Sequence, residues 1–317
     1  MGLLLSAFSK ERDRFARFTI GIPVSSGDDH VLETLNFVLN EPRSSEHILN
    51  KVVVVASGID EKMLEQLTAF ARSNEKVKLI LEDKRYGKWE AINRLIDNSE
   101  GEYLVLLNGD AMPLPGSIDR LLEKITSDDR IAVVSAFPLA YSGTSLTGSV
   151  VEIFWDAHNE ALTRLNQYGG NNHSCDELMV VRLDKISKLP PGTINDGAYI
   201  AGSAYLAGYR ISFCRNAFVK VRVPKKLGDL LRQRRRIIFG HMQIWNALGR
   251  APRTMESLSV QDPKLALTIL VAIMSRKPRH ILVLPVALVE EAFAMFLAWI
   301  DKLTRSKRHL VWDRYVR

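Results

Sequence analysis

The stretch YLVLLNGDAMP at residues 103–113 joins a strand pattern to a polar turn. Tyr103–Leu107 is an uninterrupted apolar run of strand length, and Asn108–Pro113 holds residue types that form tight turns. A strand without a polar face indicates burial on both sides, as in a parallel sheet covered by helices. The carboxylate of this turn, Asp110, would then lie just beyond the carboxyl end of a strand.

The same pattern recurs on either side. Short β-branched or leucine-rich runs predict further strands, separated by segments with the apolar spacing of helices. This alternation predicts an α/β fold with a layered, mostly parallel sheet that binds ligands beyond the carboxyl ends of its strands. The predicted strands are Phe18–Ile22, Lys51–Ala56, Val77–Leu81 and Ile131–Ser135; the predicted helices are Val31–Leu39, Glu61–Ala71, Trp89–Ile96 and Ser117–Ile125.

The second half of the chain has longer helical segments. Pro252 and Pro263 flank a polar joint, which divides the chain into a large domain over residues 1–255 and a C-terminal amphipathic segment over residues 256–317. Before the joint, the patterns predict an amphipathic helix at Val151–Asn166, strands at Met179–Arg182 and Tyr209–Phe213, and helices at Ile194–Ala207 and Leu227–Leu248.

Composition excludes several classes of protein. The 317 residues are 46% hydrophobic, so the chain is not disordered, and its two cysteines cannot form a disulfide framework.

The net charge of +7 is concentrated in one segment: residues 215–253 contain eleven Lys or Arg and one acid, Asp229. Such a stretch indicates an anionic partner. Dinucleotide, P-loop, zinc-protease and nucleophile-elbow motifs do not occur in the sequence.

Asp110 is a candidate ligand for Mg²⁺ or Mn²⁺. These cations take few protein carboxylates and complete their shell with water and substrate phosphates. Lys88, in the loop after a predicted strand, would place a cation beside a phosphate at the same edge of the sheet. The alternatives are an ordinary turn at Asp110 and a solvated basic surface around Lys88.

The C-terminal segment contains two apolar stretches. Leu265–Met274 is too short to cross a bilayer, and Ile281–Ile300 carries Glu290 and Glu291 at its centre, so both are predicted to lie in a membrane interface. Basic residues after Asp301, with Trp312 and Tyr315 as anchors, fit an anionic lipid surface. The alternative is a helical pair packed on the large domain or on a second subunit. Met1–Phe8 lacks the basic start of a signal peptide, which predicts a cytosolic location.

From Phe18 to about Trp245 the order of motifs resembles the family 2 glycosyltransferases. Pro23 and Ser25 stand in a loop similar to the nucleotide loop of the family, and Ser57 follows a strand similar to the one that holds the base. Residues 87–93, GKWEAIN, resemble the Gly-Lys-x-x-Ala-x-Asn segment. Asn108-Gly109-Asp110 falls at the metal-binding Asp-x-Asp motif, Asn195-Asp196 at the acidic pair that carries the catalytic base, and Gln233-x-x-Arg236 at the Gln-x-x-Arg-Trp signature of the membrane-associated synthases.

The resemblance implies a GT-A fold and an inverting transfer of sugar from a nucleoside diphosphate, with UDP as the expected nucleotide. It implies Asp196 as the general base and Asp110 as the ligand of Mg²⁺ or Mn²⁺. The acceptor would be a lipid-linked or membrane-associated glycan, and the protein would sit as a peripheral or monotopic protein on the cytoplasmic face of the cell membrane. The implied donor-binding residues are Pro23, Ser25, Ser57, Lys88, Asn108, Gln233 and Arg236.

Three positions depart from the family pattern. Asn108 replaces the first metal aspartate, Ile237 replaces the signature tryptophan, and Gly197 stands where one count from Gly208-Tyr209-Arg210 places the base. Two other functions therefore remain as alternatives: a catalytically impaired scaffold with a GT-A fold, and a basic nucleic-acid-binding protein that uses residues 215–253. The latter stretch lacks the interleaved aromatic residues expected of a nucleic-acid surface.

Overall fold

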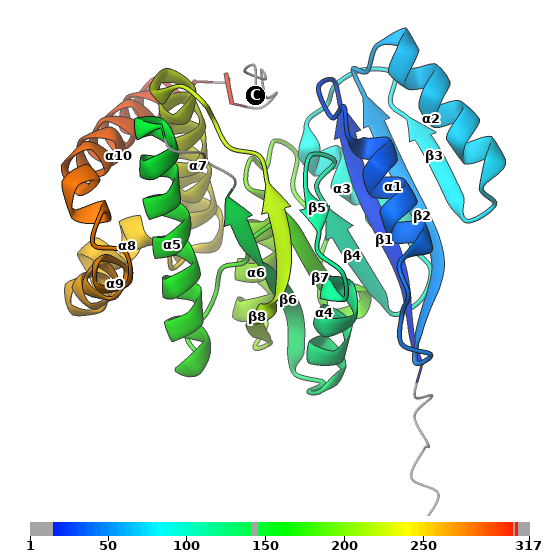
Figure 1. Cartoon of the computed structure of the whole chain (residues 1–317), viewed down its shortest axis with the longest axis horizontal. Coiled ribbons are helices and arrows are strands. Elements are labelled where there is room, and N and C mark those ends of the chain that lie inside the picture. Colours follow the sequence, from blue (N-terminus) through cyan, green and yellow to red (C-terminus); the bar gives the residue numbers. More distant parts are fainter. Residues whose placement is uncertain (1–14, 141–144, 307, 310–317) are drawn as a thin grey trace, which may run out of the picture.

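The computed structural model describes residues 15–140, 145–306 and 308–309. Met1–Phe8, Trp312 and Tyr315 lie outside these residues. The described chain forms a curled eight-stranded sheet with helices on both faces, and α5, α7 and α8–α10 lie together at one side (Figure 1). The strands are β1 (Ala16–Ser25), β2 (His47–Ser57), β3 (Val77–Leu81), β4 (Tyr103–Leu107), β5 (Met112–Pro113), β6 (Ile131–Ala140), β7 (Leu178–Arg182) and β8 (Arg210–Val221).

Most helices nearly coincide with the predicted ones, but the segment between Pro252 and Pro263, predicted as a polar joint, contains the helix α8. The helices are α1 (Val31–Asn40), α2 (Glu61–Ser73), α3 (Lys88–Asp97), α4 (Ser117–Thr126), α5 (Leu146–Gln167), α6 (Asp196–Leu206), α7 (Leu227–Leu248), α8 (Met255–Gln261), α9 (Pro263–Arg276) and α10 (His280–Leu303), with a short 3₁₀ turn at Leu183–Lys185. In α1, α3 and α4 the apolar spacing places a stripe of buried side chains against the sheet.

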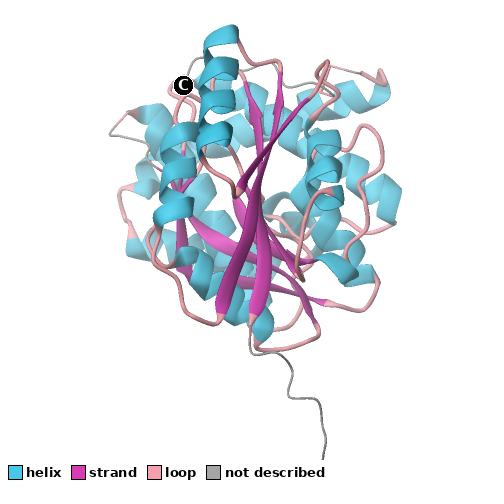
Figure 2. Cartoon of the chain, turned by 90° about the vertical axis from the view of Figure 1, so that its right-hand side faces the viewer, coloured by secondary structure: helices cyan, strands magenta, loops and turns pink. Residues whose placement is uncertain are grey.

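Side chains alternate between two hydrophobic clusters, one on each face of the sheet. On β2, Val52 and Val54 contact the cluster that α1, α2, α4 and α5 cover, whereas Val53 and Val55 contact the cluster of α3 and α6. Figure 2 shows the twisted strands between helices on either side. The prediction of strands buried on both faces is confirmed for β2 and β4. Val52–Ala56 of β2 are buried, and so is every residue of β4.

Two predictions about the strands are wrong. Within the described part of the chain, β3 is an edge strand that pairs with β2, and its residues are half-buried or exposed rather than buried on both faces. The strand predicted at Tyr209–Phe213 continues to Val221, because its second half pairs with Phe137–Ala140 after a register shift. The sheet is mixed: β7 runs antiparallel between β4 and β6, and β5 is antiparallel to β8.

The antiparallel strand β7 brings two loops together at the edge of the sheet. Its first residue, Leu178, pairs with Leu107, the last residue of β4. The backbone N–H of Asn108 donates to the carbonyl of Glu177 at 3.1 Å. The loop that precedes β7 therefore lies beside the loop that follows β4.

The helices α8–α10 pack on the rest of the chain through α5 and α7. Apolar side chains of α9, such as Ile269 and Ile273, belong to the same cluster as the core of the sheet. The division at residue 255 stays a prediction, because the two predicted segments share this core.

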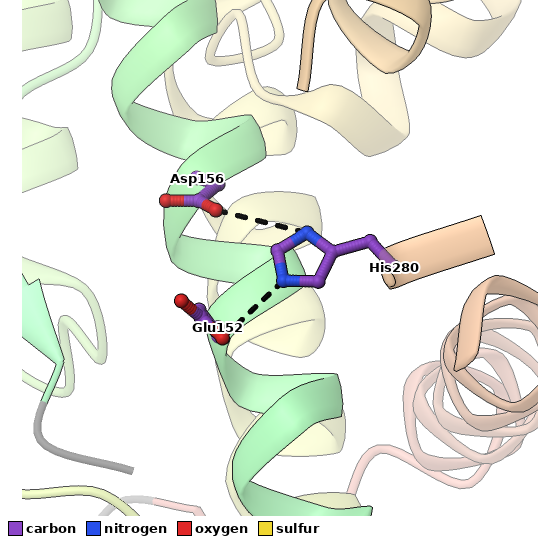
Figure 3. A group of neighbouring side chains, drawn as sticks. All are labelled: Glu152, Asp156 and His280. Carbon is purple, nitrogen blue, oxygen red and sulfur yellow. Dashed lines mark hydrogen bonds and ion pairs between the residues drawn. The ribbon is translucent and has the colours of Figure 1, made fainter. Parts of the chain in front are cut away.

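A charged joint holds the turn between α9 and α10 against α5. His280 lies between Glu152 and Asp156, with Nε2 3.2 Å from Glu152 Oε2 and Nδ1 3.8 Å from Asp156 Oδ2 (Figure 3). Lys277 Nζ contacts both carboxylates, at 2.6 and 2.8 Å, and Arg279 also contacts Glu152. The three groups in Figure 3 have the chemistry of metal ligands, but these two cations already neutralise the carboxylates. We therefore assign the cluster to an ion-pair joint.

Candidate active site

One cavity of about 590 Å³ opens at the carboxyl ends of β1, β2 and β4. It continues past α6 and α7 to the apolar side chains of α9 and α10, including Leu270, Leu284 and Leu288. All nine site residues predicted from the sequence line this cavity: Pro23, Ser25, Ser57, Lys88, Asn108, Asp110, Asp196, Gln233 and Arg236.

The loops after β1 and β4 pack tightly against each other. Asp28 accepts a hydrogen bond from the backbone N–H of Ser25 at 2.7 Å, which closes the first loop. A Cβ added at Gly109 would lie 2.9 Å from both Asp28 Oδ2 and the carbonyl oxygen of Pro23. Glycine at this position is therefore required for the turn that carries Asp110 to approach the first loop.

Lys88 bridges two aspartates at the centre of the cavity. Its Nζ lies 2.8 Å from Asp176 Oδ2 and 3.1 Å from Asp196 Oδ2. Lys88 is the first residue of α3 and follows Gly87, whose φ is 118°. Asp196 is the first residue of α6, where the helix dipole favours negative charge. The predicted base and the predicted phosphate cation thus form one charged group with a third residue, Asp176.

These groups shift one another's proton affinities. Burial alone would lower the pKa of Lys88, but the two aspartates raise it well above its usual value, so its charge is permanent. Burial raises the pKa of Asp196 to about 6, with a further contribution from the charge of Asp176 and opposition from Lys88. Burial would raise the pKa of Asp176, but the charge and the hydrogen bond of Lys88 lower it to about 2. Of the two aspartates, Asp196 is thus the one whose pKa lies nearer to 7.

Sequence reasoning missed Asp176 and Glu177. Each lies beside a residue that departs from the family pattern: Glu177 beside Asn108, and Asp176 beside Gly197. Asn108 Nδ2 donates to Glu177 Oε2 at 2.8 Å. The carboxylate of Glu177 therefore lies beside position 108, where the family pattern has a metal-binding aspartate. A Cβ at Gly197 would lie 2.6 Å from the Cβ of Asp176, so the absence of a side chain there makes room for that acid. The available signal was the acidic pair Asp176-Glu177, which stands one residue before the predicted strand at Met179–Arg182.

Glu177 itself has an unusual proton affinity. Burial and the neighbouring charge of Asp176 raise its pKa to about 7, against the opposing effect of Lys88. A carboxyl group near its midpoint at neutral pH releases its proton readily when a cation comes close.

Helix α7 fixes the start of α6. Asn195 Nδ2 donates to the carbonyl of Ile237 at 2.8 Å, and Gln243 accepts from the N–H of Ile194 at 3.0 Å. The two helices approach so closely that a Cβ at Gly240 would lie 2.5 Å from the Asn195 side chain. The helix that carries Gln233 and Arg236 therefore also positions Asp196.

Two arginines of the basic stretch are neutralised by acids of the C-terminal helices. Arg234 pairs with Glu291 at 2.6 Å and with Glu256, which joins α7 to α10 and α8. Arg235 contacts Asp301 of α10 with two hydrogen bonds, at 2.5 and 2.6 Å. Arg234 and Arg235 thus serve as anchors for the C-terminal helices, which weakens the case for a nucleic-acid surface.

The pairing of Glu291 with Arg234 explains one of the two acidic residues in the apolar C-terminal stretch. Helical spacing places Glu291 on one side of α10 and Leu282, Val289 and Phe296 on the opposite side. Those three side chains are 84%, 70% and 55% exposed. Within the described residues, α10 is one helix whose length and composition would allow it to cross a membrane, and 17% of its most apolar stretch is buried.

Comparison with known proteins identifies the family. The family described as "Glycosyl transferase family 2" matches residues 19–189. The chain is 23% identical to glycosyltransferase AglE of Haloferax volcanii, over 82% of each chain. It is 20% identical to poly-beta-1,6-N-acetyl-D-glucosamine synthase of Staphylococcus aureus over 64% of its own length, and this match spans half of the synthase.

Solved structures share the fold. Mannosyltransferase PcManGT of Pyrobaculum calidifontis, in complex with GDP-Man and Mn²⁺, has a TM-score of 0.62 and 18% identity, over 93% of this chain and 89% of that one. GalNAc-T7 with UDP, GalNAc and Mn²⁺ has a TM-score of 0.50 and 14% identity, over 66% of this chain and 43% of that one.

The chain belongs to glycosyl transferase family 2. It has a GT-A fold and is a glycosyltransferase. The predictions of family, fold and enzyme class are confirmed.

Proposed function

We propose that this glycosyltransferase moves a sugar, with inversion, from a nucleoside diphosphate sugar to a hydroxyl of a lipid-linked or membrane-associated glycan. UDP is the expected nucleotide. The observation that carries the proposal is the cavity of about 590 Å³, which runs from the loops after β1, β2 and β4 to the apolar side chains of α9 and α10. A polar donor and an acceptor on a lipid would meet in the middle, beside Lys88 and Asp196.

Asp196 is proposed as the general base. It would take the proton of the acceptor hydroxyl as that oxygen attacks the anomeric carbon and the bond to the diphosphate breaks, through a transition state resembling an oxocarbenium ion. Its raised pKa fits this role, because a base acts best when its proton affinity is near the working pH. Lys88 and Arg236 would stabilise the charge that develops on the leaving diphosphate.

A divalent cation fits the acids at the edge of the sheet. Asp110 and Glu177 both line the cavity, and Asn108 links them through its hydrogen bond to Glu177. Two carboxylates with an amide are hard oxygen ligands of the kind that Mg²⁺ and Mn²⁺ prefer. Such a cation supplies neutralisation of the leaving diphosphate. Both structurally similar transferases are complexes with Mn²⁺. We therefore propose that Glu177 replaces the aspartate missing at position 108.

The first test is a thermal-shift screen of nucleoside diphosphate sugars with and without Mn²⁺. We expect one nucleotide to raise the melting temperature only when the metal is present, because the proposed site needs both. Glu177→Gln should weaken Mn²⁺ binding, measured by titration calorimetry, by about 10-fold or more, as expected when a charged ligand is lost. Glu102→Gln, a substitution outside the cavity lining, is the control. No response to any nucleotide, or equal Mn²⁺ affinity in the Glu177 variant, would contradict the proposal.

The exposed side of α10 is proposed as the membrane contact. Leu282, Val289, Phe293 and Phe296 form a stripe at helical spacing, and all four are exposed. Exposed apolar side chains on α9, Leu267 and Val271, add to this surface. A soluble monomer rarely leaves a patch of this kind exposed. This surface supports a peripheral or monotopic protein; the cytoplasmic face remains part of the proposal.

Liposome flotation tests the membrane contact. Replacing Leu282, Val289 and Phe296 together with glutamate should lower binding to vesicles containing anionic lipid at least about 10-fold, because each side chain would contribute roughly 1 kcal/mol or more of apolar burial. Leu206→Glu on α6, an exposed leucine outside α8–α10, should have no effect. Equal flotation of the triple variant and the wild type would rule out this surface.

A further inference from the structure

A row of aromatic rings lines the cavity beyond the charged centre. His158 of α5, His173 of the loop before β7 and His241 of α7 contact one another edge to face, with ring centroids 5.5 and 5.4 Å apart. Trp155 extends the row at 5.5 Å from His158. His241 lies on α7, the helix that also carries Ile237 in place of the signature tryptophan, and both residues line the cavity. The row therefore places aromatic rings in the cavity that lacks this tryptophan.

The three imidazoles contain polar atoms without partners. His158 Nε2, His173 Nδ1 and His241 Nδ1 are shielded from water and make no hydrogen bond to any described residue. A buried polar atom left in this state costs about 1–3 kcal/mol. Such atoms are rare in folded proteins without a functional reason. Rotation of an imidazole by 180° exchanges its nitrogen and carbon positions with little change in shape, so the rings can present nitrogens to a ligand.

The charge state of the three histidines indicates which kind of ligand they can bind. Burial lowers the pKa of all three histidines, that of His158 to about 4, so they are neutral near pH 7. A neutral imidazole has one donor and one acceptor nitrogen, and a sugar hydroxyl likewise donates and accepts. A phosphate only accepts, so it would leave the acceptor nitrogens unpaired.

The row shares one cavity with the charged centre and with the apolar side chains of α9 and α10. Asp176, which contacts Lys88, contributes to the electrostatic field at all three rings. Glu256, which pairs with Arg234, also acts on all three rings, and Arg234 in turn binds Glu291 of α10. The histidines therefore line the same cavity as Asp196 and the apolar side chains where a lipid-linked acceptor is proposed to bind.

From this arrangement we infer that His158, His173 and His241 form the acceptor subsite, and that they bind the hydroxyl groups of an acceptor sugar rather than a lipid phosphate. The inference rests on the proposed function and specifies its acceptor. It places the last sugar of the acceptor on the histidine row, with one hydroxyl directed at Asp196.

The test compares wild type with His173→Phe/His241→Phe, which keeps two rings and removes their nitrogens. The probes are octyl glycosides of glucose, galactose, mannose and N-acetylglucosamine, with octyl phosphate as the anionic counterpart, and binding is measured by saturation-transfer NMR. We expect at least one glycoside to bind the wild type and to lose about 10-fold affinity in the variant, the loss of about one or two neutral hydrogen bonds. His30→Phe, an exposed histidine outside the cavity, is the control.

Stability separates a binding role from a structural one. Because the nitrogens are unpaired in the free protein, the double phenylalanine variant should melt at the same temperature or higher. A single His173→Gln variant, which keeps hydrogen-bonding groups, should retain part of the glycoside affinity. Stabilisation by nucleotide and Mn²⁺ should be unchanged in all variants, so its loss would count against the donor site and not against the histidines. A lower melting temperature, equal glycoside affinity in the variant, no glycoside binding by the wild type, or tighter binding of octyl phosphate would overturn the inference.

Discussion

Replacing Asp196 with asparagine is expected to lower the rate of sugar transfer by about 10²–10⁴-fold, the usual contribution of a general base. Asparagine has nearly the same shape but cannot accept the proton of the acceptor hydroxyl. The measurement is kcat of the purified protein with saturating donor, and Asp97→Asn is the control because Asp97 is an exposed carboxylate paired with Lys188.

The pH profile provides a second readout for Asp196. Because a base acts in its deprotonated form, and burial raises the pKa of Asp196 to about 6, the wild-type rate should rise with pH through this value and then level off. A rate for Asp196→Asn within about threefold of wild type would refute the assignment. If Asp176→Asn caused the larger loss, the base would be Asp176, the acid that occupies the space beside Gly197.

Replacing Lys88 with methionine is expected to destabilise the protein by about 3 kcal/mol, the lower end of the range for breaking a buried ion pair. The change leaves Asp176 and Asp196 side by side without their shared cation, and like charges in a buried site repel. The lower end applies because the Asp176 side chain is 38% exposed. The measurement is the free energy of unfolding in urea.

A matched control for Lys88 exists on the surface. Lys188→Met removes an ion pair with Asp97 in which both side chains are at least half exposed, and such pairs contribute about 1 kcal/mol or less. Lys88→Met should also abolish stabilisation by nucleotide, whereas Lys188→Met should not. Equal effects of the two substitutions on stability would show that Lys88 does not hold the charged centre together.

The sequence was sufficient to predict the α/β class and most elements, because burial leaves a local signature, and the resemblance to a family supplied the GT-A fold. The apolar run at Tyr103–Leu107 and the periodic stripe of Leu227–Leu248 each coincide with an element of the structure. The nine predicted site residues line one cavity because the loops after parallel strands meet at one edge of the sheet. Only their roles remain to be measured.

Asp176 and Glu177 could not be found in this way, because their importance depends on pairing between distant strands. They lie about 70 residues from Asn108 in the sequence, and only the antiparallel pairing of β7 with β4 brings them beside it. The histidine row likewise joins α5, α7 and a loop, and none of its residues belongs to a local motif. Local patterns predict elements, but contacts between elements decide which acids and rings share a site.

The most direct test of the account measures transfer itself. Purified protein would be incubated with Mn²⁺, a labelled nucleoside diphosphate sugar chosen by the thermal-shift screen, and a lipid extract of membranes. The account predicts label in a lipid-soluble glycan, attached with inverted anomeric configuration, and its near-complete loss with Asp196→Asn. Absence of transferred label with every nucleotide sugar that binds, or equal transfer by wild type and Asp196→Asn, would contradict it.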